Sequence, residues 1–355
     1  MGQQLTVQQR NAMFAQATRQ NIQSFGKKTL TQGATMADFL LPKARLLSKI
    51  YLECDFKFKL KHATKTELET DDFTPYRPLR RISLDLNNGF SPFVIGGKEL
   101  ALLNAMRMHS NVVFPQHITS SAYCYAPEKL VASAEGTSNH IRTTIELNTT
   151  LNDRDPIGIV LLQNNETAVE LKVDLETESM FIGNADGFVV EVEEITLQAS
   201  AETFSIPAVA EAFPDISVIK LVTSRTETFP GNGQNLIDLT TGTIYRKLAF
   251  IVEDMDGHPF DDEDFTSNID LIFNTADVNY SIPAKTLRHI DESQLGIALP
   301  KGCYAFDFSY NGLSNLGGTR DYIDTERLTS FQLRFNSAKA GRIRIINENL
   351  ARLVG

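Results

Sequence analysis

The chain contains a long stretch in which apolar and polar residues alternate without a break. From Ile50 to Lys61, every second residue is apolar or cysteine, and the residues between them are charged or tyrosine. Successive side chains on a β-strand point to opposite faces of a sheet, so this pattern predicts a strand with one buried and one solvated face. The same period returns in later stretches and indicates an all-β protein: residues 82–86, 141–147, 169–175, 248–252, 269–273, 304–310, 331–335 and 343–346.

Within residues 188–197 the alternation changes phase. Apolar residues occupy even-numbered positions up to Val192 and odd-numbered positions from Ile195 onward. One extra residue in a strand moves the following side chains to the other face, so the phase change predicts a β-bulge near Glu193 and Glu194.

Helical signals are few. Residues 3–25 are rich in Gln, with apolar residues at partly helical spacing, and predict a weakly amphipathic helix that stops near Gly26. An extended connector is expected over residues 26–44. Two shorter helices are predicted, at residues 98–108 and 207–213.

These signals divide the chain into an N-terminal helix and extended arm (residues 1–44), a first β domain (45–205) and a second β domain (206–355). Each domain has about 150 residues, which gives room for eight short strands and matches the size of a jelly roll. We therefore predict an all-β fold of two eight-stranded jelly-roll barrels in one chain, with a short N-terminal helix and few other helices.

Charge is distributed unevenly along the chain. The formal net charge is −10. The first 50 residues contain seven basic residues and one acidic residue, a net charge of +6, so the remainder carries −10 − 6 = −16. A basic N-terminal segment on an acidic body fits either a solvated tail or an arm that faces an anionic surface, such as phospholipid head groups or nucleic acid.

The cysteines and apolar runs bear on the compartment of the protein. Cys54, Cys124 and Cys303 are far apart and odd in number, which does not form a disulfide framework and fits synthesis in a reducing compartment. No signal peptide is visible at the Gln-rich N-terminus, and the longest strongly apolar run, residues 157–162, is too short to span a bilayer.

Motifs that carry chemistry are missing from the sequence. It contains no phosphate-binding loop, no G-x-S-x-G nucleophile elbow and no H-E-x-x-H zinc helix. The six histidines are dispersed, without the close H-x-H pair of a cupin oxygenase, which favours structural or surface roles for them. The pattern therefore predicts no catalytic residue and no cofactor.

The most acidic stretch lies at residues 253–264, and its carboxylates are hard oxygen ligands of the kind that Ca²⁺ prefers. The candidate ligands are Asp254, Asp256, Asp261 and Asp262. Pro259 stands where a calcium loop needs glycine, and Phe265 stands where it needs a bidentate glutamate. A solvated acidic loop is therefore favoured over a metal site.

Three segments carry a resemblance to a known family. A Gln-rich basic helix leads into the pattern L-P-K-x-x-L-L-x-x-I-x-L at Leu41–Leu52, and two further segments are Asp155–Asn164 and Leu328–Leu350. Together with the total length, they resemble major capsid proteins of the double jelly-roll lineage. The similarity is greatest to those of tectivirus-like, tailless phages of Gram-positive bacteria, which carry a membrane inside the shell.

This resemblance implies a role in a virion capsid that assembles in the host cytoplasm. Three chains would form a homotrimeric capsomer of pseudo-hexagonal outline, which tiles an icosahedral shell. The implied partners are neighbouring capsomers, penton and minor capsid proteins and the internal lipid membrane, with no specific nucleic acid. The N-terminal arm would lie against the membrane, where its basic residues would meet lipid phosphates, in agreement with the charge distribution. These residues are Arg10, Arg19, Lys27 and Lys28.

Two alternatives stay open from the sequence. One is a virion spike or fibre protein that binds a receptor or a glycan, which would more often show aromatic-rich loops or a fibrous N-terminal repeat. The other is a cupin-like enzyme with two barrels, whose metal triad or paired carboxylates would come together only in the folded chain.

Overall fold

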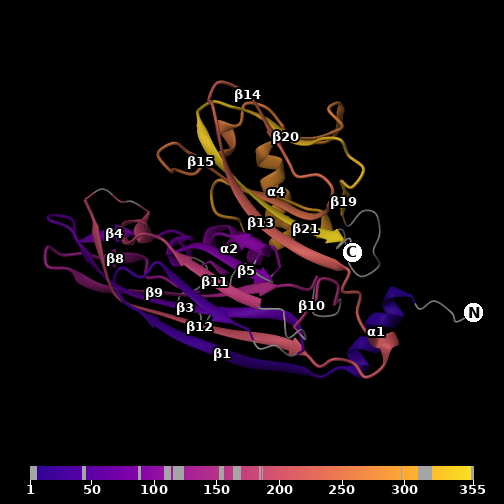
Figure 1. Ribbon diagram of the computed structural model, residues 1–355. Helices are drawn as coiled ribbons and strands as arrows, with labels where there is room; N and C mark the ends of the chain where they lie inside the picture. Colours follow the sequence, from indigo (N-terminus) through magenta and orange to yellow (C-terminus); the bar gives the residue numbers. More distant parts are fainter. Residues whose placement is uncertain are drawn as a thin grey trace, which may run out of the picture. The chain divides into compact units, whose positions relative to one another are not determined.

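The structure is a computed structural model (Figure 1). It describes residues 6–41, 45–86, 89–107, 113–114, 124–151, 156–162, 169–183, 185, 187–296, 298–310 and 322–352. The chain forms two compact units. The first extends to Lys220. The second runs from Leu221 to Arg352 and also includes residues 105–110. The sequence placed the boundary between residues 205 and 206, whereas the chain passes from one unit to the other between Lys220 and Leu221.

The first unit contains a sheet in the order β1–β12–β3–β9–β7, with β10 also paired to β3. Its strands are β1 (Gln20–Leu30), β3 (Leu46–Lys61), β7 (Cys124–Tyr125), β9 (Thr137–Asn148), β10 (Val160–Leu161) and β12 (Val189–Phe204). These pairings are antiparallel. Along β3, every second side chain from Ile50 to Leu60 is 0% exposed. The predicted alternating strand is therefore confirmed.

The second sheet of this unit has the order β6–β5–β11–β2, and a small sheet pairs β4 with β8. The strands are β2 (Met36–Leu40), β4 (Glu67–Glu69), β5 (Leu79–Leu86), β6 (Phe90–Ile95), β8 (Lys129–Val131) and β11 (Val169–Leu175). The helical segments are α1 (Val7–Ala17), α2 (Gly97–Ala105) and the 3₁₀ turns η1 (Thr74–Tyr76), η3 (Glu178–Ile182) and η4 (Ala210–Ala212). The α2 helix confirms the one predicted at residues 98–108, of which 108 lies outside the described residues.

The bulge predicted near Glu193 and Glu194 is present. The register between β12 and β3 shifts between Val192 and Glu194, so that Val192 lies opposite Phe58 and Glu194 lies opposite Lys57. The bulge lets β12 keep Val190 and Val192 before it, and Ile195 and Leu197 after it, on the core side.

The N-terminal segment differs from the prediction of a helix over residues 3–25 and an extended connector over 26–44. The α1 helix starts at a capping box of Thr6 and Gln9 and ends before Thr18, whose backbone is extended. Residues 20–30 then form the edge strand β1 on β12, and residues 36–40 form β2 on β11. The Gln-rich sequence lacks a clear period because only pairing with β12 decides its conformation.

The second unit has a sheet in the order β18–β15–β21–β13, with β19 paired to β15, and a second sheet in the order β14–β20–β16–β17. The strands are β13 (Val218–Phe229), β14 (Gly233–Asp238), β15 (Ile244–Asp254), β16 (Ile269–Phe273), β17 (Asp277–Ile282), β18 (Cys303–Asp307), β19 (Ile323–Asp324), β20 (Phe331–Ser337) and β21 (Gly341–Arg352). The helical segments are α4 (Ala284–Leu295) and the 3₁₀ turns η5 (Asp262–Asp264) and η6 (Phe308–Tyr310).

Side chains from both sheets form one hydrophobic core in the second unit. Phe250 of β15 and Ile345 of β21 belong to the same buried cluster as Leu271 of β16 and Leu333 of β20. The arrangement is a β-sandwich, in which each strand presents alternate residues to the shared core.

In the second half of the chain, one helix prediction was wrong and one helix was missed. The helix predicted at residues 207–213 is only the short turn η4. The helix α4 was not predicted, although Pro283 precedes it and Gly296 ends it in the left-handed conformation. Among the described residues, no helix combines the length and the apolar character needed to cross a bilayer.

Candidate interaction surfaces

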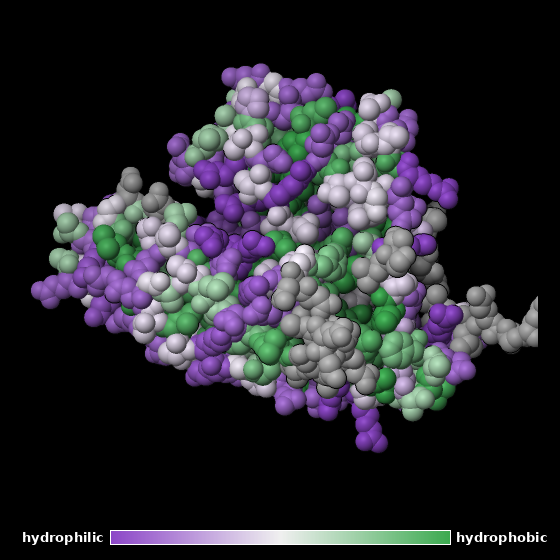
Figure 2. All heavy atoms as spheres, in the orientation of Figure 1, coloured by the Kyte–Doolittle hydropathy of each residue, from purple (hydrophilic) through white to green (hydrophobic). Residues whose placement is uncertain are grey.

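The outward face of the first sheet carries rows of opposite charge. Alternate lysines of β3 lie beside glutamates of β12, in the pairs Lys57–Glu194 (3.5 Å), Lys59–Glu193 (3.7 Å) and Lys61–Glu191. Because the side chains are partly exposed, each pair stabilises the fold by no more than about 1 kcal/mol. In Figure 2, hydrophilic residues line the lower edge of the first unit, where β12 and β1 run. This surface suits polar contacts.

The same face holds a hollow of about 570 Å³. It is lined by residues of four strands: Lys27 of β1, Glu53, Cys54 and Asp55 of β3, Arg142 and Thr144 of β9, and Thr196 and Gln198 of β12. Asp55 is paired in turn with His140, at 2.7 Å between Oδ1 and Nε2. Cations, carboxylates, hydroxyls and an amide are mixed in the lining, so it can form hydrogen bonds with a polar partner.

Cys54 is the one sulfur in this lining, and it is not a nucleophile. Its side chain is fully buried on the core side of β3. Burial raises the pKa of the Cys54 thiol far above its ordinary value, so the thiolate needed for nucleophilic attack does not form.

The four basic residues predicted to face an anionic surface lie on α1 and β1. Arg10 on α1, Arg19 between α1 and β1, and Lys27 on β1 are exposed. Lys28 lies 2.8 Å from Asp38 of β2, and the hydrogen bond from Lys28 lowers the pKa of the Asp38 carboxyl. The structure thus offers three exposed cations along the arm and engages the fourth in an ion pair.

A buried aromatic side chain helps to attach the α1 helix to the first unit. Phe14 is buried in a cluster with Leu46 and Ile159, and its ring meets that of Phe204 edge-on, with centroids 5.4 Å apart. A reciprocal pair of hydrogen bonds follows, in which Arg19 N–H donates to the Ser205 hydroxyl and Ser205 N–H donates to the Arg19 carbonyl, both at 2.9 Å. The arm is therefore part of the folded unit and not a free tail.

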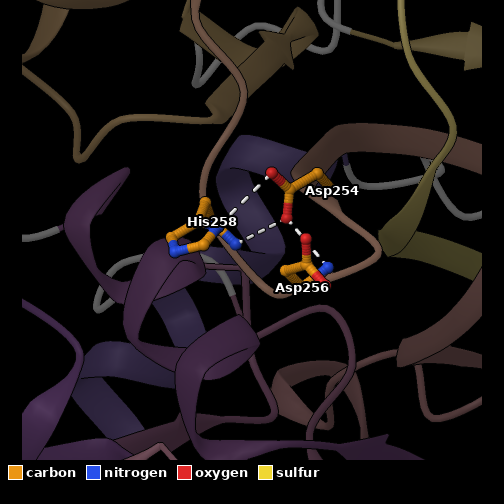
Figure 3. Close-up of side chains that lie close together, drawn as sticks. All are labelled: Asp254, Asp256 and His258. Carbon is orange, nitrogen blue, oxygen red and sulfur yellow. Dashed lines mark hydrogen bonds and ion pairs between the residues drawn. The ribbon is translucent and has the colours of Figure 1, made fainter. Parts of the chain in front are cut away.

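The acidic stretch of the second unit forms a tight turn after β15 (Figure 3). Asp254, Asp256 and His258 place their ligand atoms within 4.8 Å of one another, and Asp254 lies between the other two. The Asp254 carboxylate accepts hydrogen bonds from the backbone N–H groups of Asp256 (3.0 Å) and His258 (2.9 Å). Partial burial acts to raise the pKa of Asp254, but these two bonds, the neighbouring His258 ring and the Lys339 ammonium outweigh it and leave the pKa lowered.

Asp261 and Asp262 lie apart from this group. Asp261 pairs with Lys301 at 3.0 Å, and that hydrogen bond lowers the pKa of Asp261. Asp262 accepts a hydrogen bond of 2.9 Å from the Tyr304 hydroxyl. Of the four candidate calcium ligands, the structure therefore brings only Asp254 and Asp256 together, and Asp254 already serves as the acceptor that closes the turn.

Sequence reasoning did not identify the charge pairing between β3 and β12. A signal for it was present: lysines at every second position of β3 and a run of glutamates at the start of β12. Opposite charges on directly opposed strand positions stabilise one pairing register, so two such stretches in one chain indicate neighbouring strands.

No family model and no curated protein matches the sequence. Solved structures do match. The crystal structure of the major capsid protein of STIV, the Sulfolobus turreted icosahedral virus, aligns with a TM-score of 0.68 at 12% identity, covering 94% of this chain and 97% of that one. The PBCV-1 virus capsid aligns with a TM-score of 0.66 at 12% identity, covering 94% of both chains. The major capsid protein of bacteriophage PM2 aligns with a TM-score of 0.55 at 12% identity, covering 94% and 98%.

The chain has the double jelly-roll fold. The prediction of two jelly rolls in one all-β chain is thus confirmed, and the solved structures that share this double jelly roll are viral major capsid proteins. At 12% identity the likeness concerns the fold and assigns no individual residue a role.

Proposed function

We propose that this double jelly-roll protein is the major capsid protein of an icosahedral virion. The observation that supports the proposal is the extent of the structural match, which takes in 94% of this chain and 97% of the STIV capsid protein. The two chains therefore share one fold over nearly their full lengths. A double jelly roll protects most of its strand edges, which allows copies to pack side by side without uncontrolled strand pairing.

In this proposal three chains form a capsomer of pseudo-hexagonal outline, and the capsomers contact one another and the penton and minor capsid proteins. The resemblance noted in the sequence favours a tailless, tectivirus-like phage with an internal membrane and a Gram-positive host. Assembly in the host cytoplasm suits the three free thiols Cys54, Cys124 and Cys303, which are all buried. Such a role needs shape and complementary surfaces and no catalytic group.

The solution mass tests the trimer. One chain has a mass of 39.5 kDa, so the trimer has 3 × 39.5, or about 118 kDa. Sedimentation equilibrium of the purified chain is expected to give this mass over a wide range of concentration. A monomer at every concentration would contradict the capsomer, and a monomer with a stoichiometric metal would favour the cupin-like enzyme.

We also propose that the arm contacts the internal membrane through Arg10, Arg19 and Lys27. Each basic residue at an anionic lipid surface contributes about 1 kcal/mol. Changing Arg10→Glu and Arg19→Glu together should therefore weaken binding to phosphatidylglycerol vesicles by at least roughly thirtyfold, because the two lost cations alone account for about 2 kcal/mol. The matched control reverses the same number of charges on β3, Lys57→Glu with Lys59→Glu. Equal loss in both variants, or equal binding to phosphatidylcholine vesicles, would refute the contact by the arm.

A further inference from the structure

Three ionisable side chains form a row across three adjacent strands of the second unit. Lys247 of β15 lies directly opposite Asp307 of β18 and, on its other side, directly opposite Glu348 of β21. Residues directly opposite on neighbouring antiparallel strands project from the same face of the sheet. Lys247 therefore shares one face of the sheet with two carboxylic acids, one on each neighbouring strand.

All members of the row are buried. The side chains of Lys247 and Asp307 are each 6% exposed, and that of Glu348 is 4% exposed. Lys247 Nζ donates to Asp307 Oδ2, and Arg107 pairs with Glu348. Asp307 Oδ1 accepts hydrogen bonds from the N–H (3.0 Å) and the hydroxyl (2.6 Å) of Ser309. The Asp307 carboxylate is thus oriented from one side and approached by the amine from the other.

Remaining a buried ion pair is unfavourable for Lys247 and Asp307. Each ion loses its hydration, and the mutual attraction often fails to offset that cost. An amide between the same atoms carries no net charge, and burying it costs far less than burying two ions. Holding the two reacting groups in contact also removes the entropic cost of bringing them together, which is a large part of the barrier to condensation.

We propose that Lys247 and Asp307 condense to form an isopeptide bond that joins β15 to β18. Glu348 takes a proton from the Lys247 ammonium, and the neutral amine attacks Cγ of Asp307. The Nζ–Cγ bond forms and one Cγ–O bond breaks. The released oxygen leaves as water, after it takes one proton back from Glu348 and a second proton from the Lys247 nitrogen. An ammonium and a carboxylate become one amide and one water, so charge is conserved and no further reactant is needed.

The same chain provides an internal comparison. Lys28 and Asp38 also form a lysine–aspartate pair, at 2.8 Å, but their side chains are 37% and 50% exposed. Water solvates both ions there and no carboxylate is placed opposite the lysine on a third strand. The proposal therefore expects a bond at Lys247–Asp307 and none at Lys28–Asp38.

The intact mass of the denatured full chain tests the proposal without any variant. The wild-type chain is expected to be lighter than its sequence by the mass of one water. Tryptic digestion should then give a branched peptide that contains both Lys247 and Asp307, because trypsin does not cleave after an acylated lysine, and should release Lys28 normally. A wild-type chain with the full sequence mass, and cleavage after Lys247, would overturn the proposal and leave an ordinary ion pair.

Two variants separate the bond from the fold. Lys247→Arg keeps a cation for Asp307 but cannot condense, so its mass should equal that of its sequence while it still assembles like the wild type. Glu348→Gln keeps the size of the side chain but cannot accept the proton, and condensation after synthesis should slow at least tenfold. A Lys247→Arg chain that still lacks one water, or a Glu348→Gln chain that condenses at the wild-type rate, would contradict the assigned roles.

Discussion

A single buried carboxyl should make the stability of the second unit depend on pH. Asp291 lies on α4, is 3% exposed, and accepts a hydrogen bond of 3.0 Å from the Ala305 N–H of β18. Burial is the main cause that raises the pKa of Asp291 from 3.8 to about 8; the hydrogen bond from Ala305 acts in the opposite direction, and the Glu292 charge adds to the rise, as does Asp307 for as long as it is ionised. Asp291 therefore keeps its proton in the folded protein at neutral pH.

The sign of the effect follows from proton linkage. In the unfolded chain the Asp291 carboxyl ionises near pH 3.8, but in the folded chain it ionises only near pH 8, so the folded state binds the extra proton between these values. The stabilisation is complete below pH 3.8 and is lost as the pH rises to about 8. At about 1.4 kcal/mol per pKa unit, the difference of 8 − 3.8 = 4.2 units corresponds to a loss on the order of 6 kcal/mol.

The variant Asp291→Asn isolates this effect, because asparagine has nearly the same shape and does not titrate. The free energy of unfolding is measured by urea denaturation of both proteins between pH 5 and pH 9. The free energy of unfolding of the variant, relative to that of the wild type, should rise by about 1.4 kcal/mol for each pH unit up to about pH 8 and should stay constant above it. The control is Asp256→Asn, which makes the same chemical change at an exposed carboxyl. Parallel curves for wild type and Asp291→Asn would refute the reasoning.

Three further substitutions test local features. Phe14→Ala removes the buried aromatic ring of α1 and should weaken the attachment of this helix by about 3–5 kcal/mol; hydrogen exchange should show loss of protection in α1 alone, and protected α1 amides would contradict Phe14 as its main anchor. Gly302→Ala should destabilise the chain by about 1–3 kcal/mol in thermal unfolding, because its φ is +74° and a Cβ would lie 2.6 Å from a backbone oxygen. Gly242→Ala, where φ is +81° but the surrounding space is open, should destabilise the chain less than Gly302→Ala. Equal losses in the two variants would exclude the contact between the added Cβ at position 302 and the backbone oxygen as a cause. Lys57→Glu reverses one exposed charge beside β12 and should cost less than about 1 kcal/mol in urea denaturation, so a larger loss would show that the pair is more than a surface contact.

The strands that could be predicted from the sequence are those with one face in a core and one in solvent. On β3 and β20 the alternation is visible because each position has a fixed environment. On β1 it is not, because this edge strand pairs only with β12 among the described strands and exposes most of its residues. The polar sequence of β1 therefore resembles a helix or a tail until its partner is known.

The candidate surfaces were predictable only in composition. The basic arm and the acidic stretch stand out in the sequence, but the partner of Lys28 depends on how β1 lies beside β2. The row of Lys247, Asp307 and Glu348 depends on the register of three strands that are far apart in the chain. Such contacts follow from strand order, which the alternation of apolar residues does not specify.

Electron microscopy of the purified, concentrated chain tests the central claim most directly, namely that this double jelly roll is a unit of a viral shell. The chain should form particles of hexagonal outline that associate side by side into sheets or closed shells. Separate, irregular monomers that never associate, at concentrations where the protein stays folded, would contradict it.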